Sequence, residues 1–357
     1  MHDFWLGKKV FITGHTGFKG GWLSLWLSKL GADVTGYALA PESSPSLFDV
    51  ARIEDHVTSI IGDIRDYAAL EAAISQSNPE IVFHLAAQPL VRRSYDEPKK
   101  TFETNVMGTA NVMEAIRISQ HSCRAIINVT TDKCYQNNQS MWGYRELDQL
   151  GGSDPYSYSK SCAEFVASAY KKSFFNKQKI HLVSVRAGNV IGGGDWSSDR
   201  LIPDIVDCIF NGKRLLIRNP TAIRPWQHVL EPIFGYMTVA KKIFNEQLSD
   251  INDYDAFNFG PEQEESKSVE WIVKRFIEQY GNSASYELRS NHQENSHEEK
   301  ILVLDNTKAK LLLEWKPKID LSSAIHRTYE WYKAYHEGVS MKEFTMEQIE
   351  EYEKFVF

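Results

Sequence analysis

The sequence predicts an α/β fold in which helices cover both faces of a doubly wound parallel sheet, followed by a smaller C-terminal lobe. Up to about residue 190, short β-branched runs alternate with longer segments of helical periodicity, which is typical of such sheets. The runs are almost continuously apolar, as expected of strands buried on both faces. Beyond Val190 the connections become rich in Gly, Asp and Pro, so a separate mixed α/β lobe is predicted there.

The expected elements follow the chain in alternation. The strands are predicted at residues 10–13, 33–37, 81–85, 125–130 and 181–186. The helices of the same region are predicted at residues 22–30, 67–76, 98–119 and 156–175, and those of the C-terminal lobe at 269–280, 307–314 and 322–336. Ligands of such sheets bind beyond the carboxyl ends of the strands, so the residues that follow each strand are the candidates for function.

Composition and charge exclude several classes of protein. The 357 residues are 42% hydrophobic and 24% charged, as in an ordinary soluble globular protein. A net charge of -7 without a long basic run argues against nucleic acid as the main ligand. No stretch has the length of a membrane span, and no signal-peptide-like segment precedes the first strand. We therefore expect a cytoplasmic protein without a membrane or nucleic-acid partner.

No metal site is expected. The cysteines are far apart and form no CxxC pair, so they are interpreted as inert thiols. The nearest histidine pair, His292 and His297, lies in a polar stretch that is interpreted as a solvated loop. The four cysteines are Cys123, Cys134, Cys162 and Cys208.

A glycine-rich turn follows the first predicted strand. The segment Gly14-His15-Thr16-Gly17-Phe18-Lys19-Gly20-Gly21 leads directly into an apolar helix. Glycines there let the backbone approach a pyrophosphate, and the helix N-terminus supplies free N–H groups. A GxxGxxG triplet also occurs in plain turns, so its place between strand and helix carries the prediction. The residues expected to bind a dinucleotide are Gly14, Thr16, Gly17, Phe18 and Gly20.

Two further segments at strand ends belong to the same predicted site. Asp63, in Gly62-Asp63-Ile64, could accept a hydrogen bond from an adenine amino group or could cap the next helix, and the sequence favours neither. The small side chains after the strand at 81–85 would let a dinucleotide lie against the backbone. The candidates from these segments are Asp63, Ile64, Leu85, Ala86, Ala87 and Gln88.

The predicted cofactor is NAD, on the evidence of the second strand. It ends in Gly36-Tyr37-Ala38-Leu39-Ala40, without the acidic residue that usually holds the ribose of NAD. The chain also lacks an Arg or Lys there for the 2′-phosphate of NADP, the first being Arg52. NAD is therefore favoured, with weak retention of the cofactor.

A Tyr and a Lys stand at catalytic spacing. Tyr156 and Lys160 lie four residues apart, on one face of a helix expected to begin near Pro155. A phenol has a pKa near 10, so it is a poor base unless a nearby cation stabilises the phenolate, as Lys160 can. An isolated YxxxK would be an ordinary amphipathic helix. Here, however, Thr130-Thr131-Asp132-Lys133 ends a strand and is expected to bring a hydroxyl, a carboxyl and an ammonium beside Tyr156.

These motifs together resemble those of the extended short-chain dehydrogenase/reductase family, over nearly the whole chain. The residues that carry the resemblance are Gly14, Gly17, Gly20, Thr131, Tyr156 and Lys160. The resemblance implies a Rossmann-type domain at residues 1–188, with a returning segment near 226–257, that binds NAD. It implies a substrate lobe for a nucleotide-linked sugar at residues 189–225 and 258–357.

Within that family, the residues after Thr131 distinguish the reactions. Asp132 matches the general acid of the 4,6-dehydratases, which the 4-epimerases generally lack, and Lys133 departs from the usual Glu. Together with residues 142–146, 151–156, 192–196 and 224–228, this departure resembles the branch that acts on CDP-glucose. The implied activity is that of a lyase that converts CDP-D-glucose to CDP-4-keto-6-deoxy-D-glucose, a step of deoxysugar biosynthesis such as that of lipopolysaccharide O-antigens.

The resemblance also implies roles for the catalytic side chains. Tyr156 removes the proton of the C4 hydroxyl, which Thr131 can hydrogen-bond, and Asp132 protonates the departing C6 hydroxyl. Lys133 is the candidate base at C5 if its pKa is lowered by burial. If Lys133 stays charged it stabilises an enolate, and the C5 base is unassigned.

Cations are needed for the diphosphate of the substrate. Arg224 and Arg200 are the candidates, with Arg218 as a further one, although each such Arg is by default a surface charge. Asn189, which follows a strand end, is a fourth substrate candidate. By analogy with the family, the helices at 98–119 and 156–175 would pair across the interface of a homodimer or higher homo-oligomer.

Two alternatives remain open at this point. A nucleotide-sugar 4-epimerase would use Thr131, Tyr156 and Lys160 but release no water. A non-catalytic NAD-binding regulator on the same fold would have no need of Tyr156 and Lys160 at catalytic spacing.

Overall fold

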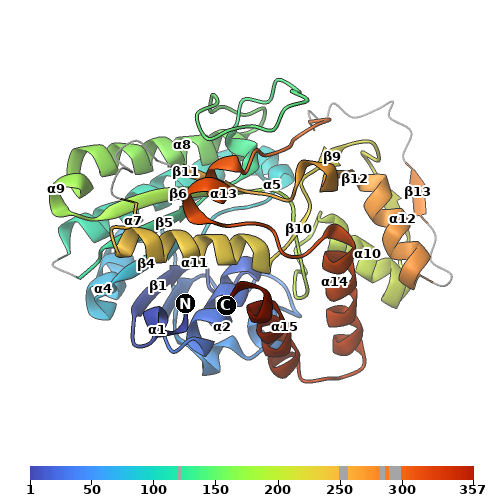
Figure 1. The fold of residues 1–357 in the computed structure, drawn as a ribbon, viewed down its shortest axis with the longest axis horizontal. Helices are drawn as coiled ribbons and strands as arrows, with labels where there is room; N and C mark the ends of the chain where they lie inside the picture. Colours follow the sequence, from blue (N-terminus) through green and yellow to red (C-terminus); the bar gives the residue numbers. More distant parts are fainter. Residues whose placement is uncertain (120–121, 249–255, 282–285, 289–298) are drawn as a thin grey trace.

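A parallel sheet forms the centre of the protein (Figure 1). The computed structural model describes residues 1–119, 122–248, 256–281, 286–288 and 299–357, and His292 and His297 lie outside these ranges. The sheet has seven strands in the order β11-β6-β5-β4-β1-β2-β3. The strands are β1 (Lys9–Thr13), β2 (Asp33–Ala38), β3 (Thr58–Ile61), β4 (Ile81–His84), β5 (Ala125–Val129), β6 (His181–Ala187) and β11 (Ala256–Phe259).

Alternate residues of β1 pack into two separate cores. Phe11 belongs to the cluster formed with α4 (Tyr67–Ser77), α7 (Gly108–Ile118) and α8 (Pro155–Tyr170). Val10 and Ile12 face α2 (Phe18–Lys29) and α11 (Leu230–Phe244) on the other side. Successive side chains of a strand point to opposite faces, so a strand covered by helices on both sides is apolar at successive positions, as Val10, Phe11 and Ile12 are. The predicted fold class, a doubly wound Rossmann-type sheet, is confirmed.

The register of the sheet aligns the strand ends. Thr13 pairs with Tyr37 of β2 and with His84 of β4, and His84 pairs with Asn128 of β5. The strand order reverses between β1 and β4. The loops after β1, β4 and β5 therefore meet at one edge, where ligands bind in folds of this kind.

Smaller elements build the C-terminal part of the chain. Short strands pair into two-stranded sheets there. The pairs are β7 (Val190–Ile191) with β10 (Gln227–His228), β8 (Leu215–Ile217) with β13 (Tyr286–Leu288), and β9 (Ile223–Arg224) with β12 (Lys267–Ser268). The helices are α10 (Leu201–Asn211), α12 (Val269–Tyr280), α13 (Thr307–Leu313), α14 (Leu321–His336) and α15 (Met341–Val356). Figure 1 shows α10, α12 and β13 at one end of the molecule, away from the sheet.

The predicted elements agree with the structure to within a few residues, with two local differences. The helix expected at 98–119 consists of α6 (Pro98–Phe102), a π-helical turn at Glu103–Met107 and α7. The helix expected at 156–175 ends in a second π-helical turn, Lys171–Phe175. The short helices are α1 (His2–Trp5), α3 (Leu47–Val50), α5 (Val91–Asp96) and α9 (Asn176–Gln178), with 3-10 turns at Ile53–Asp55, Asp132–Cys134 and Gln263–Glu265.

The cysteines, the membrane spans and the division into domains can be compared with the sequence predictions. All four cysteines are reduced thiols, and only Cys162 is partly exposed. In the described part of the chain, no helix combines the length and apolar character needed to cross a bilayer. The division into a cofactor domain and a substrate lobe stays a prediction; β11 belongs to the central sheet, whereas α15 packs against α2.

Candidate functional site

The glycine turn after β1 lies against the segment after β4. Gly14 has a φ of +85°, and a Cβ on it would lie 2.9 Å from the backbone nitrogen of Ala86. The backbone nitrogens of Leu85 and Ala86 each donate to Oγ1 of Thr13 at 3.2 Å. Two of the predicted cofactor segments are thus in direct contact, and only a glycine permits this approach.

The other two glycines of the turn play different structural parts. A Cβ on Gly20 would lie 2.0 Å from the carbonyl oxygen of Gly14, so Gly20 closes the turn. Gly17 is the N-cap of α2, makes no side-chain cap, and has space above it, because a Cβ there would meet only Gly14 O at 3.4 Å. The first N–H groups of α2 therefore have the open surroundings that a phosphate requires.

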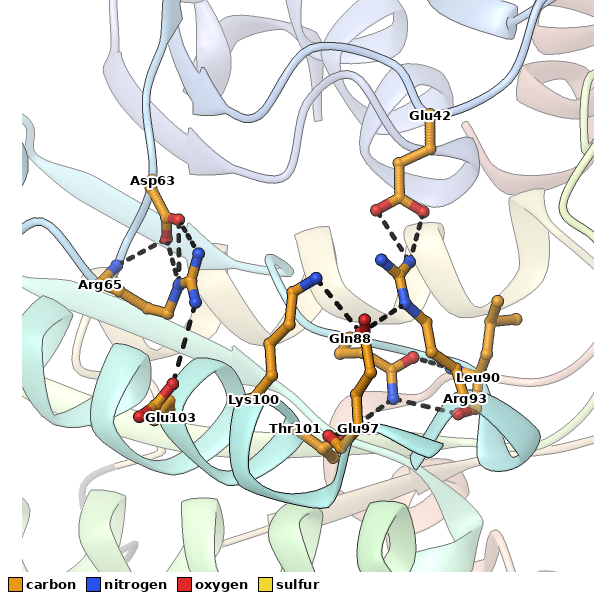
Figure 2. Close-up of polar contacts among 10 residues, drawn as sticks. All are labelled: Glu42, Asp63, Arg65, Gln88, Leu90, Arg93, Glu97, Lys100, Thr101 and Glu103. Carbon is orange, nitrogen blue, oxygen red and sulfur yellow. Dashed lines mark hydrogen bonds and ion pairs between the residues drawn. The ribbon is translucent and has the colours of Figure 1, made fainter. Parts of the chain in front are cut away.

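Asp63 is held by a neighbouring arginine. Its carboxylate accepts hydrogen bonds from Nε of Arg65, and Arg65 also reaches Glu103 at 3.9 Å (Figure 2). The hydrogen bond from Arg65 keeps the pKa of Asp63 below its usual value. The N-cap of α4 is Asp66, which accepts from the backbone nitrogen of Ala69 at 3.2 Å. The alternative that Asp63 caps this helix was wrong, and contact with adenine stays a prediction.

The remaining cofactor candidates lie around the same strand ends. The Gln88 side chain donates to Leu90 O and Thr101 Oγ1, each at 3.0 Å, and so shapes the turn after β4 (Figure 2). Oγ1 of Thr16 donates to Leu39 O at 2.8 Å. Ile64 is buried and packs in the core beside α7. Phe18, Leu85, Ala86 and Ala87 are partly exposed at the same edge.

Basic side chains that sequence reasoning missed lie at this edge. Arg93 on α5 pairs with Glu42 at 2.8 Å and with Glu97 at 3.0 Å, and Lys100 pairs with Glu97 at 3.2 Å (Figure 2). A cation for the 2′-phosphate of NADP was expected only among residues close to the second strand. The fold brings Arg65 and Arg93 to this edge from other parts of the sequence. Each is already neutralised by a carboxylate, so neither is a ready site for a 2′-phosphate.

Tyr156 and Lys160 lie one turn apart on α8. The helix starts at Pro155 with Asp154 as N-cap, whose Oδ1 accepts from the backbone nitrogen of Ser157 at 2.9 Å. Nζ of Lys160 donates to Val129 O at 3.2 Å, which fixes the ammonium at the end of β5. Burial lowers the pKa of Lys160 to about 8. Burial also raises the pKa of Tyr156 to about 12, against the opposing effect of Thr131 beside it.

Thr131, Asp132 and Lys133 begin the short turn after β5. Oγ1 of Thr131 accepts from the backbone nitrogen of Lys133 at 3.3 Å and donates to Oδ1 of Asp132 at 3.0 Å. Asp132 is 2% exposed, and its pKa is raised by this burial despite the charge of Lys133. Lys133 is partly exposed. The hydroxyl, carboxyl and phenol predicted to gather here are therefore close together.

The substrate candidates differ in their surroundings. Arg224 is buried, and its positive charge acts on the carboxyl of Asp132. Arg200 pairs with Asp195 at 3.1 Å and its charge acts on Tyr156. Arg218 instead pairs with Asp199 at 3.2 Å on a more exposed part of the lobe. The carbonyl oxygen of Asn189, which is partly exposed, accepts from Gln227 N at 3.0 Å.

One acidic residue near this centre was not predicted at all. The charges of Lys133, Asp132 and Arg224 all act on Glu299, which belongs to the segment before α13. No local motif surrounds Glu299, so its place could not be predicted from its own segment. No group of three metal-binding side chains occurs among the residues that the structure describes.

Comparison with known proteins agrees with this geometry. The family of GDP-mannose 4,6 dehydratase matches residues 11–328. The chain belongs to this dehydratase family. It is 48% identical over 355 residues to CDP-glucose 4,6-dehydratase of Salmonella typhimurium, covering 98% of this chain and 97% of that protein. It is 25% identical to CDP-paratose 2-epimerase of Salmonella typhi, over 90% of this chain and 98% of the relative.

Solved structures share the fold of this family member. UDP-glucose 4-epimerase of Thermotoga maritima, determined with UDP-glucose, has a TM-score of 0.79 at 21% identity, over 91% of this chain and 99% of that one. The dTDP-glucose 4,6-dehydratase of Bacillus anthracis, determined with NAD, has a TM-score of 0.75 at 21% identity, over 92% and 98%. The predicted resemblance to extended short-chain dehydrogenases/reductases is confirmed.

Proposed function

We propose that this protein is an NAD-dependent CDP-glucose 4,6-dehydratase, a lyase that forms CDP-4-keto-6-deoxy-D-glucose and water. The observation that carries the proposal is the buried carboxyl of Asp132 beside Thr131 and Tyr156, because an epimerase needs no acid at this point. The identity of 48% to a CDP-glucose 4,6-dehydratase supports the same reaction and substrate.

The residues at the strand edge fit a dinucleotide. A Cβ is excluded from Gly14 and Gly20, while Gly17 leaves the start of α2 open, so Gly14, Gly17 and Gly20 would hold the pyrophosphate. Lys160 would hold the nicotinamide ribose, and the ionised Asp63 would accept from adenine. Thr16, Phe18, Ile64 and residues 85–88 would line the site. When bound, NAD supplies the hydride acceptor for C4 and the hydride donor for C6.

Tyr156 is the acceptor of the C4 hydroxyl proton. In its buried position the phenol has a pKa of about 12, so it becomes a base only when positive charge gathers beside it. Lys160, one turn along α8, would supply that charge together with Arg200, whose charge already acts on the phenol. Thr131 lies between the phenol and Asp132, where its hydroxyl can hold the sugar oxygen in line with Tyr156.

Asp132 is the acid of the elimination. Burial raises the pKa of its carboxyl, which favours the protonated form that can donate to the leaving C6 hydroxyl. Lys133, which follows Asp132 directly, either removes the C5 proton or stays charged and stabilises an enolate. The diphosphate of the substrate would be bound by Arg224 and Arg200, with Asn189 nearby.

A homodimer in the cytoplasm is the proposed setting. Large apolar side chains are exposed on the helices expected to pair, which favours a second copy of the same chain as their cover. They include Phe102, Met107, Phe165 and Phe174 on α6, α8 and the two π-helical turns. The product would enter deoxysugar biosynthesis, such as that of lipopolysaccharide O-antigens.

Mass spectrometry of the product in deuterated water tests the function. The protein is incubated with NAD and CDP-glucose, with dTDP-glucose, UDP-glucose and GDP-mannose as parallel substrates. Loss of water with one solvent deuterium at C5 is expected with CDP-glucose. A galacto isomer of unchanged mass would identify an epimerase instead. Unchanged activity of a Tyr156→Phe variant would contradict the role of the phenol.

A further inference from the structure

Glu299 begins a segment that is anchored to the substrate side of the site. The backbone nitrogen of Ile223 in β9 donates to Lys300 O at 2.8 Å, and Leu302 N donates back to Ile223 O at 3.3 Å. Nδ2 of Asn137 donates to Ile301 O at 2.8 Å from the loop after β5. These bonds on both sides fix the backbone next to Glu299.

The same pairing brings this segment to Asp132. Ile223 is followed by Arg224 and Pro225, and Pro225 lies against Gly188 at the end of β6. A Cβ on Gly188 would lie 2.4 Å from Cγ of Pro225 and 3.1 Å from Oδ2 of Asp132. The strand that pairs with the Glu299 segment therefore passes beside the carboxyl of Asp132. The charges of Asp132 and Lys133 both act on Glu299.

Two buried carboxylate oxygens here have no hydrogen-bond partner among the described residues. They are Oδ2 of Asp132 and Oε2 of Glu299. A buried polar atom without a partner costs free energy, and such atoms are retained where a ligand or a reaction uses them. Burial raises the pKa of both carboxyls. A hydrogen bond from Asn137 and the charges of Lys133 and Arg224 oppose this effect on Glu299, and the charge of Asp132 adds to it. Two carboxyls in this relation favour one protonated and one ionised form.

We propose that Glu299 is the base that removes the C5 proton, in concert with Asp132 as the acid. This inference rests on the proposed dehydratase function. The C5–H bond breaks and its proton passes to the Glu299 carboxylate. The electron pair left at C5 forms the C5–C6 double bond, and the C6–O bond breaks as that oxygen takes the proton of Asp132 and leaves as water. The Glu299 carboxyl exchanges its proton with solvent and then protonates C5 when hydride is delivered to C6.

Lys133 then has a role that needs no loss of its proton. It adjoins Asp132 in sequence, and its charge acts on both carboxyls. As an ammonium it stabilises the negative charge that develops on the 4-keto oxygen while C5 is deprotonated. The sequence left two roles open for Lys133, the base at C5 or the cation that stabilises an enolate. In this proposal Glu299 is the base and Lys133 is the cation.

The test compares Glu299→Gln with Glu264→Gln, which removes an exposed carboxylate of the same lobe. Each variant is mixed rapidly with NAD and CDP-glucose, and two signals are followed: absorbance of reduced nicotinamide, and deuterium from solvent at C5. We expect Glu299→Gln to slow turnover by roughly 10²–10⁴-fold, to accumulate reduced nicotinamide and to take up no deuterium. Glu264→Gln should match the unmodified protein in both signals.

Other results would overturn the inference. Wild-type deuterium uptake by Glu299→Gln would do so, as would loss of C4 oxidation in that variant, because C5 is deprotonated only after C4 has been oxidised. Lys133→Gln serves as the rival variant: if it alone accumulates reduced nicotinamide without C5 exchange, Lys133 is the base. CDP binding and thermal unfolding check that Glu299→Gln is folded. Glu299→Asp, which keeps a carboxylate, should recover part of the deuterium uptake at C5. Failure of the unmodified protein to release water would instead refute the proposed function.

Discussion

The hydroxyl of Thr131 donates a hydrogen bond of 3.0 Å to Oδ1 of Asp132, the next residue in the chain. Oδ2 of the same carboxyl has no hydrogen-bond partner among the described residues. The carboxyl is thus oriented through one oxygen while the other is available to carry a proton. Since burial favours the protonated form, the arrangement suits the role of general acid proposed for Asp132.

Replacement of Asp132 by Asn should separate the two halves of the reaction. The amide is isosteric but cannot donate a proton to the C6 oxygen, so formation of the keto-deoxy product should fall roughly 10²–10⁴-fold. Oxidation at C4 should persist, visible as reduced nicotinamide after mixing with CDP-glucose. Asp96→Asn, at an exposed position on α5, is the matched control. Equal loss of both signals would mean that Asp132 binds substrate and does not act as the acid.

Two glycines of the first turn should respond differently to the same substitution. Gly20→Ala places a Cβ 2.0 Å from Gly14 O, so it should lower the free energy of unfolding by about 3 kcal/mol. Gly17→Ala meets nothing closer than 3.4 Å and should cost about 1 kcal/mol or less. If the open space at Gly17 receives the pyrophosphate, Gly17→Ala should still weaken NAD binding by roughly tenfold or more. Urea unfolding measures the change in stability, and NAD titration measures the change in affinity. Unchanged NAD affinity in Gly17→Ala would mean that the pyrophosphate does not bind beside Gly17.

The parts of the site that could be predicted from sequence are those made by residues close in the chain. Gly14, Gly17 and Gly20 share one turn, Thr131 adjoins Asp132, and each of these patterns is recognisable from spacing alone. The strands were predictable because burial on both faces leaves them continuously apolar. The registers that bring the strand ends to one edge then placed these motifs together.

Other features depend on contacts between distant segments. Glu299 reaches Asp132 only because residues 300–302 pair with β9, and Arg93 meets Glu42 only because the loops after β2 and β4 converge. The π-helical turn at Glu103–Met107 is set by packing against α8, whereas its sequence has ordinary helical periodicity. Arg218 was proposed on charge alone, and nothing in its own segment revealed that Asp199 would pair with it.

A buried ion pair supports the strand that precedes Asp132. Arg186 donates to Glu164 in a bidentate pair, and both side chains are at most 5% exposed. Oγ1 of Thr130 donates to the same carboxylate at 2.6 Å. Glu164→Gln should therefore lower the free energy of unfolding by about 3–5 kcal/mol, because it leaves the Arg186 charge buried without its counter-ion.

The exposed pair Arg214–Glu287 provides the control for that measurement. Its side chains are 73% and 55% exposed, so Glu287→Gln should change the free energy of unfolding by less than about 1 kcal/mol. Urea denaturation of both variants gives the comparison. Similar small effects at both sites would mean that the buried pair contributes no more than a surface contact.

The buried ring of His84 should make the protein less stable in acid. Nδ1 of His84 lies 2.7 Å from Oγ1 of Thr13, and Nε2 lies 3.0 Å from Oγ1 of Thr109. Burial lowers the pKa of His84 to about 3, so the folded protein keeps the ring neutral while the unfolded chain binds a proton below about 6.5. The unfolded state therefore gains protons first as the pH falls, and stability is lost from about pH 6.5 downward.

Between pH 7 and pH 5 the protonation of His84 in the unfolded chain should lower the free energy of unfolding by about 2 kcal/mol. This corresponds to roughly 1.5 pH units below the unfolded pKa of about 6.5, at about 1.36 kcal/mol each. His84→Gln keeps a polar side chain near Thr13 and Thr109 but cannot be protonated. Its free energy of unfolding should be lower at pH 7, yet should fall by about 2 kcal/mol less than that of the unmodified protein on going to pH 5. His326→Gln, at an exposed position, should leave the pH dependence unchanged. An identical pH dependence in His84→Gln and the unmodified protein would show that the ring has the same pKa in the folded and unfolded chains, and would contradict its lowering by burial.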